Sequence, residues 1–173
     1  MEFQMKQALE VLTRTPDVLS ALLRGKSAAW ANSRKTPESF SPVDVIGHLM
    51  HADLTNWIPR ARTILDRENA RTFDPFDRFA FQHLIVGKPL DKLLDEFGEV
   101  RQTSLATLGD FGIGEEQLGL SGLHPELGAV TLSNLLSTWV VHDLGHIAQI
   151  VKAMSSAYRD AVGAWRPYLS ILD

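Results

Sequence analysis

The sequence predicts an all-α protein, a four-helix bundle that forms a single domain over residues 1–173. Apolar residues recur at three- and four-residue steps in four segments, which is the period of an amphipathic helix. Two pairs of a hydroxyl residue followed by proline, Thr15-Pro16 and Ser41-Pro42, are also a common start signal for helices. The chain is 45% hydrophobic and 22% charged, as in soluble globular proteins. A domain of this length buries about 70% of its unfolded surface, so its core does not require a metal ion.

The first helical segment covers residues 3–23. It is interrupted by Thr-Pro-Asp at residues 15–17, where threonine is a suitable cap and proline suits the first helical position. Two alternatives follow: one helix kinks at this point, or a new helix begins at Pro16.

A second helix is predicted from Pro42 to about Asp66, with Ser41 as its cap. Asp44 falls in the first turn, where negative charge is favoured. Pro59 removes one backbone hydrogen bond and should bend the helix, at a cost of about 3 kcal/mol unless packing compensates.

Residues 67–88 are predicted to be a connection that includes a short helix. Four phenylalanines gather in it, and they are too apolar to remain in water: Phe73, Phe76, Phe79 and Phe81. We expect them to pack either on their own chain or at the interface of a homodimer. His83 lies here with no evident partner and is interpreted as structural.

A third helix is predicted over residues 90–108, followed by a long, glycine-rich, irregular loop over residues 109–130. Loops of this length in a compact domain often line functional sites. His124 precedes a proline and is therefore extended, and as a lone loop histidine it is expected to be exposed.

The fourth helix is predicted over residues 131–154, with an apolar arc that must be buried: Leu132, Leu136, Trp139, Ile147, Ile150 and Met154. A short C-terminal tail follows it. We expect four apolar residues to pack this tail on the bundle: Trp165, Tyr168, Leu169 and Leu172.

His142 and His146 are four residues apart in the fourth helix, so their side chains project from the same side. Two imidazoles at this spacing can hold one divalent ion, provided a third ligand comes from elsewhere. On spacing alone, hydrogen-bonded histidines at the edge of the core are an equal alternative. Asp143 falls inside the apolar arc and needs a donor, either a histidine ring or an arginine from another helix. The simpler alternatives for Asp143 are an ordinary buried salt bridge or a helix cap.

The charge and composition of the chain limit the kinds of molecule it is expected to bind. The net charge of −4 and the absence of a basic run argue against nucleic acid. No segment approaches the roughly 20 apolar residues of a membrane span, and no signal peptide is evident, so a cytoplasmic protein is expected. Because the chain has no cysteine, histidine and carboxylate are its strong metal ligands.

Three motifs together resemble the DinB-like superfamily of helical metalloproteins: GHLMHAD at residues 47–53, HPELG at 124–128 and HDLGHIAQI at 142–150. The resemblance implies a four-helix bundle and, often, a homodimer. It also implies one divalent metal ion, often nickel or zinc, held by His48, His142 and His146. His51, three residues after His48, is then interpreted as a second-layer donor or general base rather than a ligand.

Two classes of function follow from this resemblance. The first is a metal-dependent enzyme acting on a small molecule, either a thiol-dependent S-transferase or a hydrolase. Its nucleophile would be a low-molecular-weight thiol or a water, with His51 or Asp143 handling protons. The second is a non-catalytic metal-binding or stress-associated protein. A metal-free bundle with polar core positions is a third alternative.

Overall fold

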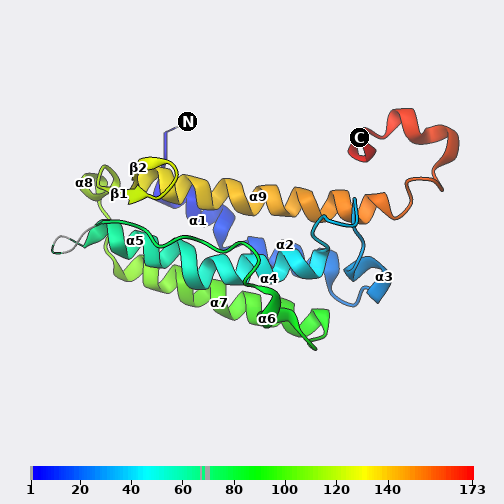
Figure 1. Cartoon of the computed structure of the whole chain (residues 1–173), viewed down its shortest axis with the longest axis horizontal. Coiled ribbons are helices and arrows are strands. Elements are labelled where there is room, and N and C mark those ends of the chain that lie inside the picture. Colours follow the sequence, from blue (N-terminus) through cyan, green and yellow to red (C-terminus); the bar gives the residue numbers. More distant parts are fainter. Residues whose placement is uncertain (1, 67, 69–70) are drawn as a thin grey trace.

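Four long helical segments lie side by side in the computed structural model, which describes residues 2–66, 68 and 71–173 (Figure 1). They are formed by α1 (Met5–Leu12) with α2 (Thr15–Leu23); α4 (Pro42–Ala52) with a π-helical turn (Asp53–Trp57) and α5 (Ile58–Leu65); α7 (Leu90–Asp110); and α9 (Leu132–Ser156). Three short helices are α3 (Ala28–Ala31), α6 (Gln82–Ile85) and α8 (Glu115–Leu118). The predicted all-α four-helix bundle is therefore confirmed.

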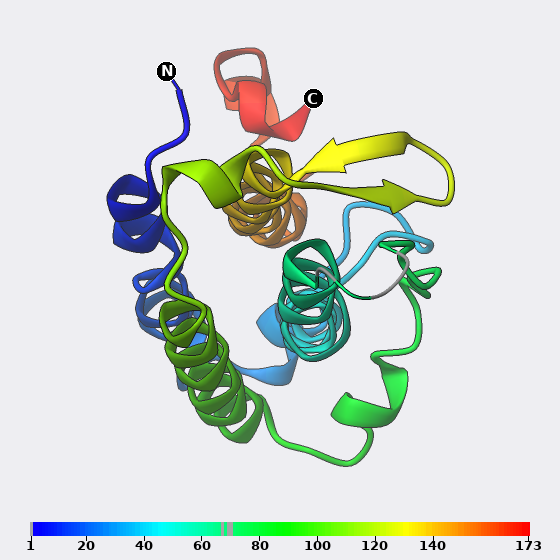
Figure 2. The same ribbon diagram turned by 90° about the vertical axis from the view of Figure 1, so that its left-hand side faces the viewer.

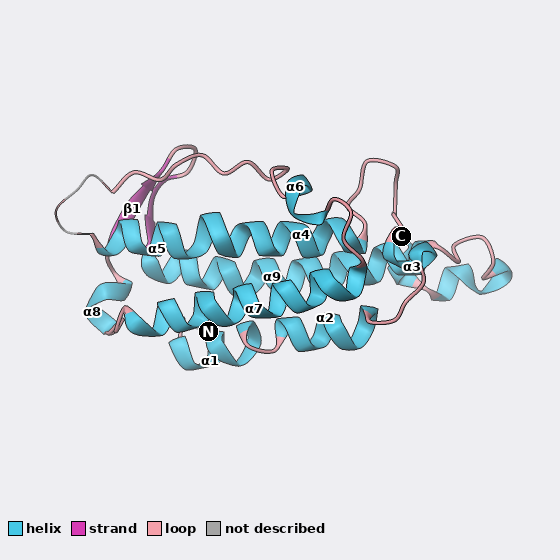
Figure 3. Ribbon diagram, turned by 90° about the horizontal axis from the view of Figure 1, so that it is seen from below, coloured by secondary structure: helices cyan, strands magenta, loops and turns pink. Residues whose placement is uncertain are grey.

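The second and third segments, α4–α5 and α7, run in the same direction along the bundle (Figures 1 and 3). A helix of 24 residues is about 36 Å long, so the chain must travel back by that length between α5 and α7. The connection does this along the outside of α4 and α5 and ends in α6 (Figure 3). This return path includes the connection predicted at residues 67–88, of which residues 67, 69 and 70 lie outside the described residues.

Two helices begin as their local sequences predict. Ser41 and Asp44 form a capping box before α4, with the Asp44 carboxylate 2.8 Å from the Ser41 backbone nitrogen. Thr131 and Asn134 form the same motif before α9. These side chains satisfy backbone N–H groups that have no partner inside the helix.

Thr15 is not a helix cap, contrary to prediction. It is the first residue of α2, and its hydroxyl donates to the carbonyl of Val11 at 3.3 Å. A new helix does begin near Pro16, because α1 ends at Leu12 and α2 starts three residues later.

A wide π-helical turn precedes Pro59 and marks the irregularity that this proline predicts. A wider turn at this point relieves the clash between the proline ring and the carbonyl of Thr55. Within this turn Asp53, Asn56 and Trp57 are buried.

Most of the phenylalanine cluster packs on its own chain. Phe73 and Phe81 are 4% and 1% exposed, and Phe76 packs on His48 and His51, whereas Phe79 is 52% exposed. The cluster therefore does not supply a large apolar surface for a homodimer. The homodimer itself stays a prediction.

Residues 109–130, expected to be irregular, instead contain α8 and most of an antiparallel hairpin of β1 (Ser121–His124) and β2 (Gly128–Thr131). An isolated hairpin of two such short strands has only marginal stability in water. They are stabilised here by the returning connection, because the Phe73 N–H donates to the Leu123 carbonyl at 3.0 Å. Gly122 permits this contact, since a Cβ there would lie 2.5 Å from the Phe73 ring.

Of the four apolar residues predicted to pack the C-terminal tail on the bundle, one is buried. Leu172, in a short 3-10 helix (Ser170–Leu172), is 2% exposed. Trp165 and Tyr168 are 72% and 82% exposed, so the prediction that they pack on the bundle is wrong. They lie in a preceding 3-10 helix (Gly163–Tyr168) that projects beyond the end of α9 (Figure 1).

Figure 2 looks along the bundle and shows the long helices arranged around a common axis. Of the predicted arc of α9, four residues are buried: Leu132, Leu136, Trp139 and Ile150. No helix in the described part of the chain is long and apolar enough to cross a membrane.

Gly47 allows α6 and the end of the connection to approach α4. A Cβ at this position would lie 2.9 Å from Phe81 Cδ2 and closer still to Ile85 Cγ2. Gly98 in α7 differs, because a Cβ there meets no atom within 4 Å. The two glycines are thus a matched pair, one required by packing and one not.

We predict that Gly47→Ala lowers the free energy of unfolding by about 1–3 kcal/mol, because the inserted methyl group overpacks a filled interface. Gly98→Ala should raise it by up to about 1 kcal/mol, because alanine is the better helix former. Urea denaturation followed by circular dichroism measures both. Equal effects in the two variants would contradict the packing role of Gly47.

Candidate metal centre

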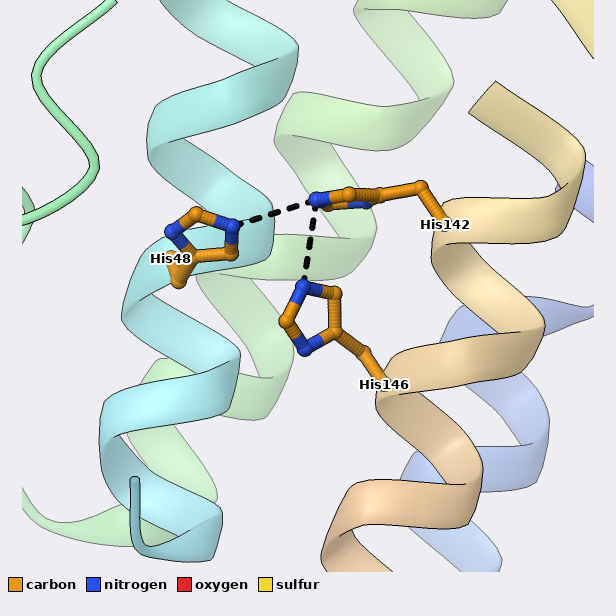
Figure 4. Close-up of side chains that lie close together, drawn as sticks. All are labelled: His48, His142 and His146. Atoms are coloured by element: carbon orange, nitrogen blue, oxygen red, sulfur yellow. Dashed lines mark hydrogen bonds between the residues drawn. The ribbon is translucent and has the colours of Figure 1, made fainter. Parts of the chain in front are cut away.

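Three histidine side chains from two helices converge between α4 and α9 (Figure 4). The Nε2 atom of His142 lies 3.1 Å from that of His48 and 3.1 Å from that of His146. The three nitrogens all lie within 4.8 Å of one another. The structure thus brings together the histidine pair of the fourth helix and the histidine of the second helix that the resemblance implies.

Aromatic side chains surround this cluster. The His48 ring packs against Phe40, Phe76 and Phe81, with ring centroids 5.6, 5.9 and 6.1 Å away. Trp57 contacts the His142 ring edge to face at 5.1 Å and stacks on Trp139. The aromatic wall excludes water from one side of the imidazoles, whereas His142 and His146 stay partly exposed.

The outward nitrogens of two histidines are bound to oxygen acceptors. His48 Nδ1 lies 3.2 Å from the carbonyl oxygen of Arg78, and His146 Nδ1 lies 2.8 Å from Gln149 Oε1. An oxygen acceptor requires the proton on Nδ1, so the Nε2 atom of a neutral ring carries a lone pair. Both lone pairs face the centre of the cluster.

Both of these histidines are neutral at neutral pH. Burial lowers the pKa of His48 from 6.5 to about 4, and a positive charge on His142 would act in the same direction. Burial likewise lowers the pKa of His146 to about 3, with His142 and His48 again contributing. Neutral imidazoles are the form that binds metal ions.

The cluster leaves hydrogen bonding incomplete unless a cation is present. A neutral His142 has one N–H, so its Nε2 can donate to at most one of the two facing lone pairs, and its buried Nδ1 has no hydrogen-bond partner among the described residues. Nitrogens bound to one ion at about 2.0–2.1 Å lie about 3.0–3.4 Å apart, depending on the angle between them. The 3.1 Å separations therefore fit a shared divalent ion.

No fourth protein ligand joins the three histidines within residues 2–66, 68 and 71–173. Structural zinc sites are closed by four protein ligands, whereas catalytic sites use three and keep a position for a small molecule. The three histidines match the ligand number of the second kind of site.

A buried ion-pair network lies beside His142. Arg101 on α7 donates to both oxygens of Asp53, at 2.6 and 3.1 Å, and to both oxygens of Asp143, at 2.5 and 3.2 Å. It also donates to the Leu12 carbonyl at 2.9 Å and packs between the rings of Phe97 and Trp139. All three charged residues are at most 1% exposed.

The network shows which group donates hydrogen bonds to the buried carboxylate of Asp143. Of the donors considered, the arginine from another helix is the one present, since His142 Nδ1 is 4.0 Å from Asp143 Oδ1. Burial raises the pKa of Asp143, but His142 and Arg101 lower it more, so the carboxyl stays ionised at neutral pH. With both oxygens bound to Arg101 and no exposure, Asp143 is poorly placed to exchange protons with a substrate.

Sequence reasoning did not identify Asp53 and Arg101 as residues of the site. A signal for Arg101 was available, because it lies at helical spacing between the buried Phe97 and Leu108 and so falls on the inward face of α7. A similar signal was available for Asp53, which lies seven and four residues after the buried Ile46 and Leu49 and so falls on the same face of the second helix.

His51 lies beside the cluster but not in it. Its Nε2 is 3.1 Å from the Asp77 carbonyl and its ring stacks on Phe76 at 5.1 Å. The structure places the two remaining histidines elsewhere. His83 is exposed and bonds to the Ala80 carbonyl. His124, expected to be exposed, is instead half-buried and accepts backbone N–H groups in the hairpin turn.

A family model described as the DinB superfamily matches residues 11–150 of the chain. Among solved structures, the chain is similar to YfiT from Bacillus subtilis, described as a probable metal-dependent hydrolase with an unusual four-helix bundle topology. The TM-score is 0.71 at 19% identity, over 93% of this chain and 91% of that one, which establishes likeness of fold. No curated protein matches the chain in sequence.

We predict that Arg101→Met lowers the free energy of unfolding by about 3–5 kcal/mol, because it leaves two buried carboxylates without their counter-charge. Arg24→Met is the control, since Arg24 pairs with Asp95 on the surface, and it should cost no more than about 1 kcal/mol. Urea midpoints give both values. A cost for Arg101→Met as small as that of the control would show that the network contributes little.

Proposed function

The chain belongs to the DinB superfamily, and from this premise we propose that it is a metal-dependent hydrolase of a small-molecule substrate. His48, His142 and His146 hold one divalent ion in this proposal. The observation that carries it is the convergence of three Nε2 atoms, two with lone pairs facing the centre, and no fourth protein ligand within the described residues. The description of YfiT as a probable metal-dependent hydrolase supports the same reaction class.

Nickel and zinc are the proposed metals, since neutral imidazoles suit both. Such an ion acts as a Lewis acid and lowers the pKa of a water or thiol bound to it. The carbonyl of Arg78 and the side chain of Gln149 hold the outward nitrogens of two ligands and so fix their ring orientation. Trp57 and Phe76 shield one side of the site from water.

His51 is the proposed general base. Its Nε2 lies at hydrogen-bonding distance from the Asp77 carbonyl, so the lone pair is on Nδ1, which has no hydrogen-bond partner in the described part of the chain. Burial lowers the pKa of His51, so the ring is neutral at neutral pH and can accept a proton. Asp143 is the weaker candidate for this role because Arg101 binds both of its oxygens.

A thiol-dependent S-transferase is the second candidate. It is favoured by the absence of cysteine from the chain, so a sulfur nucleophile must come from a low-molecular-weight thiol. The same three ligands serve both candidates, and they differ in whether water or a thiol is the nucleophile. A non-catalytic metal-binding protein would keep the ion but convert no substrate.

We predict that the protein, purified without a histidine tag, contains one divalent ion per chain. His142→Ala should lose it, because two imidazoles remain, while the helical circular dichroism stays nearly unchanged. His83→Ala, which removes an exposed histidine, should retain it. Elemental analysis measures the metal content of each variant. Hydrolytic activity is tested separately with a panel of carboxylic and phosphate esters. Stoichiometric metal in His142→Ala would disprove the ligand assignment.

The cobalt-substituted protein separates water from thiol as the nucleophile. If thiols are substrates, glutathione, bacillithiol or mycothiol should add an intense sulfur-to-metal charge-transfer band in the near ultraviolet, because thiolate then binds the ion. Failure of every thiol to produce this band, in a sample with confirmed cobalt content, would exclude the transferase. Hydrolysis or a non-catalytic role would then remain.

A further inference from the structure

Arg78 contributes two groups to the neighbourhood of the metal centre. Its backbone carbonyl accepts a hydrogen bond from His48 Nδ1. Its guanidinium lies over the rings of Phe40 and Phe79, 5.6 and 5.0 Å from their centroids. Cation–π contacts of this kind hold the side chain in place before any ligand arrives.

The guanidinium has no counter-charge of its own. No carboxylate in the described part of the chain forms an ion pair with Arg78; Arg14, Arg24 and Arg34 each pair with an aspartate, whereas Arg60, Arg62 and Arg166 do not. The neighbouring Asp77 directs a carboxylate oxygen at the Phe79 N–H instead, at 2.9 Å. The exposed guanidinium of Arg78 is therefore available to an anionic ligand.

The guanidinium is close to the three histidines. Phe40 contacts both groups, since its ring centroid is 5.6 Å from Arg78 Cζ and 5.6 Å from the His48 centroid. The sum of these distances limits their separation to about 11 Å. The positive charge of Arg78 also acts on His48, where it adds to the effects of burial and His142 in lowering the pKa. A separation of this size is within the span of a compact molecule.

We propose that Arg78 binds a carboxylate group of the substrate or cosubstrate and thereby makes the site specific for small carboxylates. This inference rests on the proposed function. The planar fork of a guanidinium matches a carboxylate with two parallel hydrogen bonds, which a neutral group of the same shape cannot form. The aromatic contacts reduce the side-chain entropy lost on binding. Arg78 is thus a specificity residue, and the chemistry stays with the histidines.

The test compares 3-mercaptopropionate with its amide, 3-mercaptopropionamide, on zinc-loaded protein by calorimetry. Both probes present the same thiol to the ion and differ in the charged carboxylate. The wild type should bind the carboxylate roughly 10-fold or more tightly than the amide. Arg78→Gln should bring this ratio close to one with unchanged zinc content, and Arg78→Lys should keep part of it because the charge remains.

Arg62→Gln is the matched control. Arg62 is also exposed and lies over a phenylalanine, Phe111, at 5.9 Å, but it is 14 residues beyond His48, about 21 Å along the helix. This variant should keep the wild-type ratio. A ratio near one in the wild type, or an unchanged ratio in Arg78→Gln, would overturn the inference.

A second measurement separates this inference from the proposed function. If the protein takes up no zinc, or if neither thiol binds the loaded protein, the proposed chemistry fails. The Arg78 Nε–H resonance is then followed by nuclear magnetic resonance during titration with succinate and with succinamide. A saturable shift with succinate alone retains Arg78 as a carboxylate-binding residue, and equal or absent shifts reject it.

Discussion

The buried interaction of Arg101 with Asp53 and Asp143 connects all four helical segments of the bundle. Arg101 belongs to α7, its carboxylate partners belong to the second segment and to α9, and Leu12 belongs to the first. Burying three charges carries a large desolvation cost, so such a network is weak evidence for added stability. It does exclude other arrangements, because any rotation or slide of α9 would separate Asp143 from Arg101. The same constraint holds His142 and His146 toward α4.

The direction of the helices determines what surrounds the site. Because α4–α5 and α7 run the same way, the chain has to return along the outside of the bundle. This return segment supplies the carbonyls of Asp77 and Arg78 to the two histidines of α4. It also supplies Phe76 and Phe81 to the aromatic wall and the guanidinium of Arg78 at its edge. The long connection therefore lines the candidate metal site as well as linking two helices.

The chemistry of the site follows from a balance between burial and hydrogen bonding. Burial keeps His48 and His146 neutral, and their outward hydrogen bonds direct both lone pairs inward. A cluster of polar atoms that cannot satisfy one another is costly unless a cation binds between them. The 173-residue bundle has a core large enough to carry this cost without depending on an ion.

Short-range features of the sequence determined the helices and two of the three histidines of the candidate site. The apolar periodicity, the capping motif at Ser41 and the spacing of His142 and His146 act within one or two turns, so they can be recognised without the fold. His48 was identified only through the resemblance to a family. The tertiary structure decided how Arg101 joins Asp53 and Asp143, how β1 and β2 form beside Phe73, and where Arg78 lies. These features join residues far apart in the chain, and such contacts depend on how the helices pack rather than on local preference.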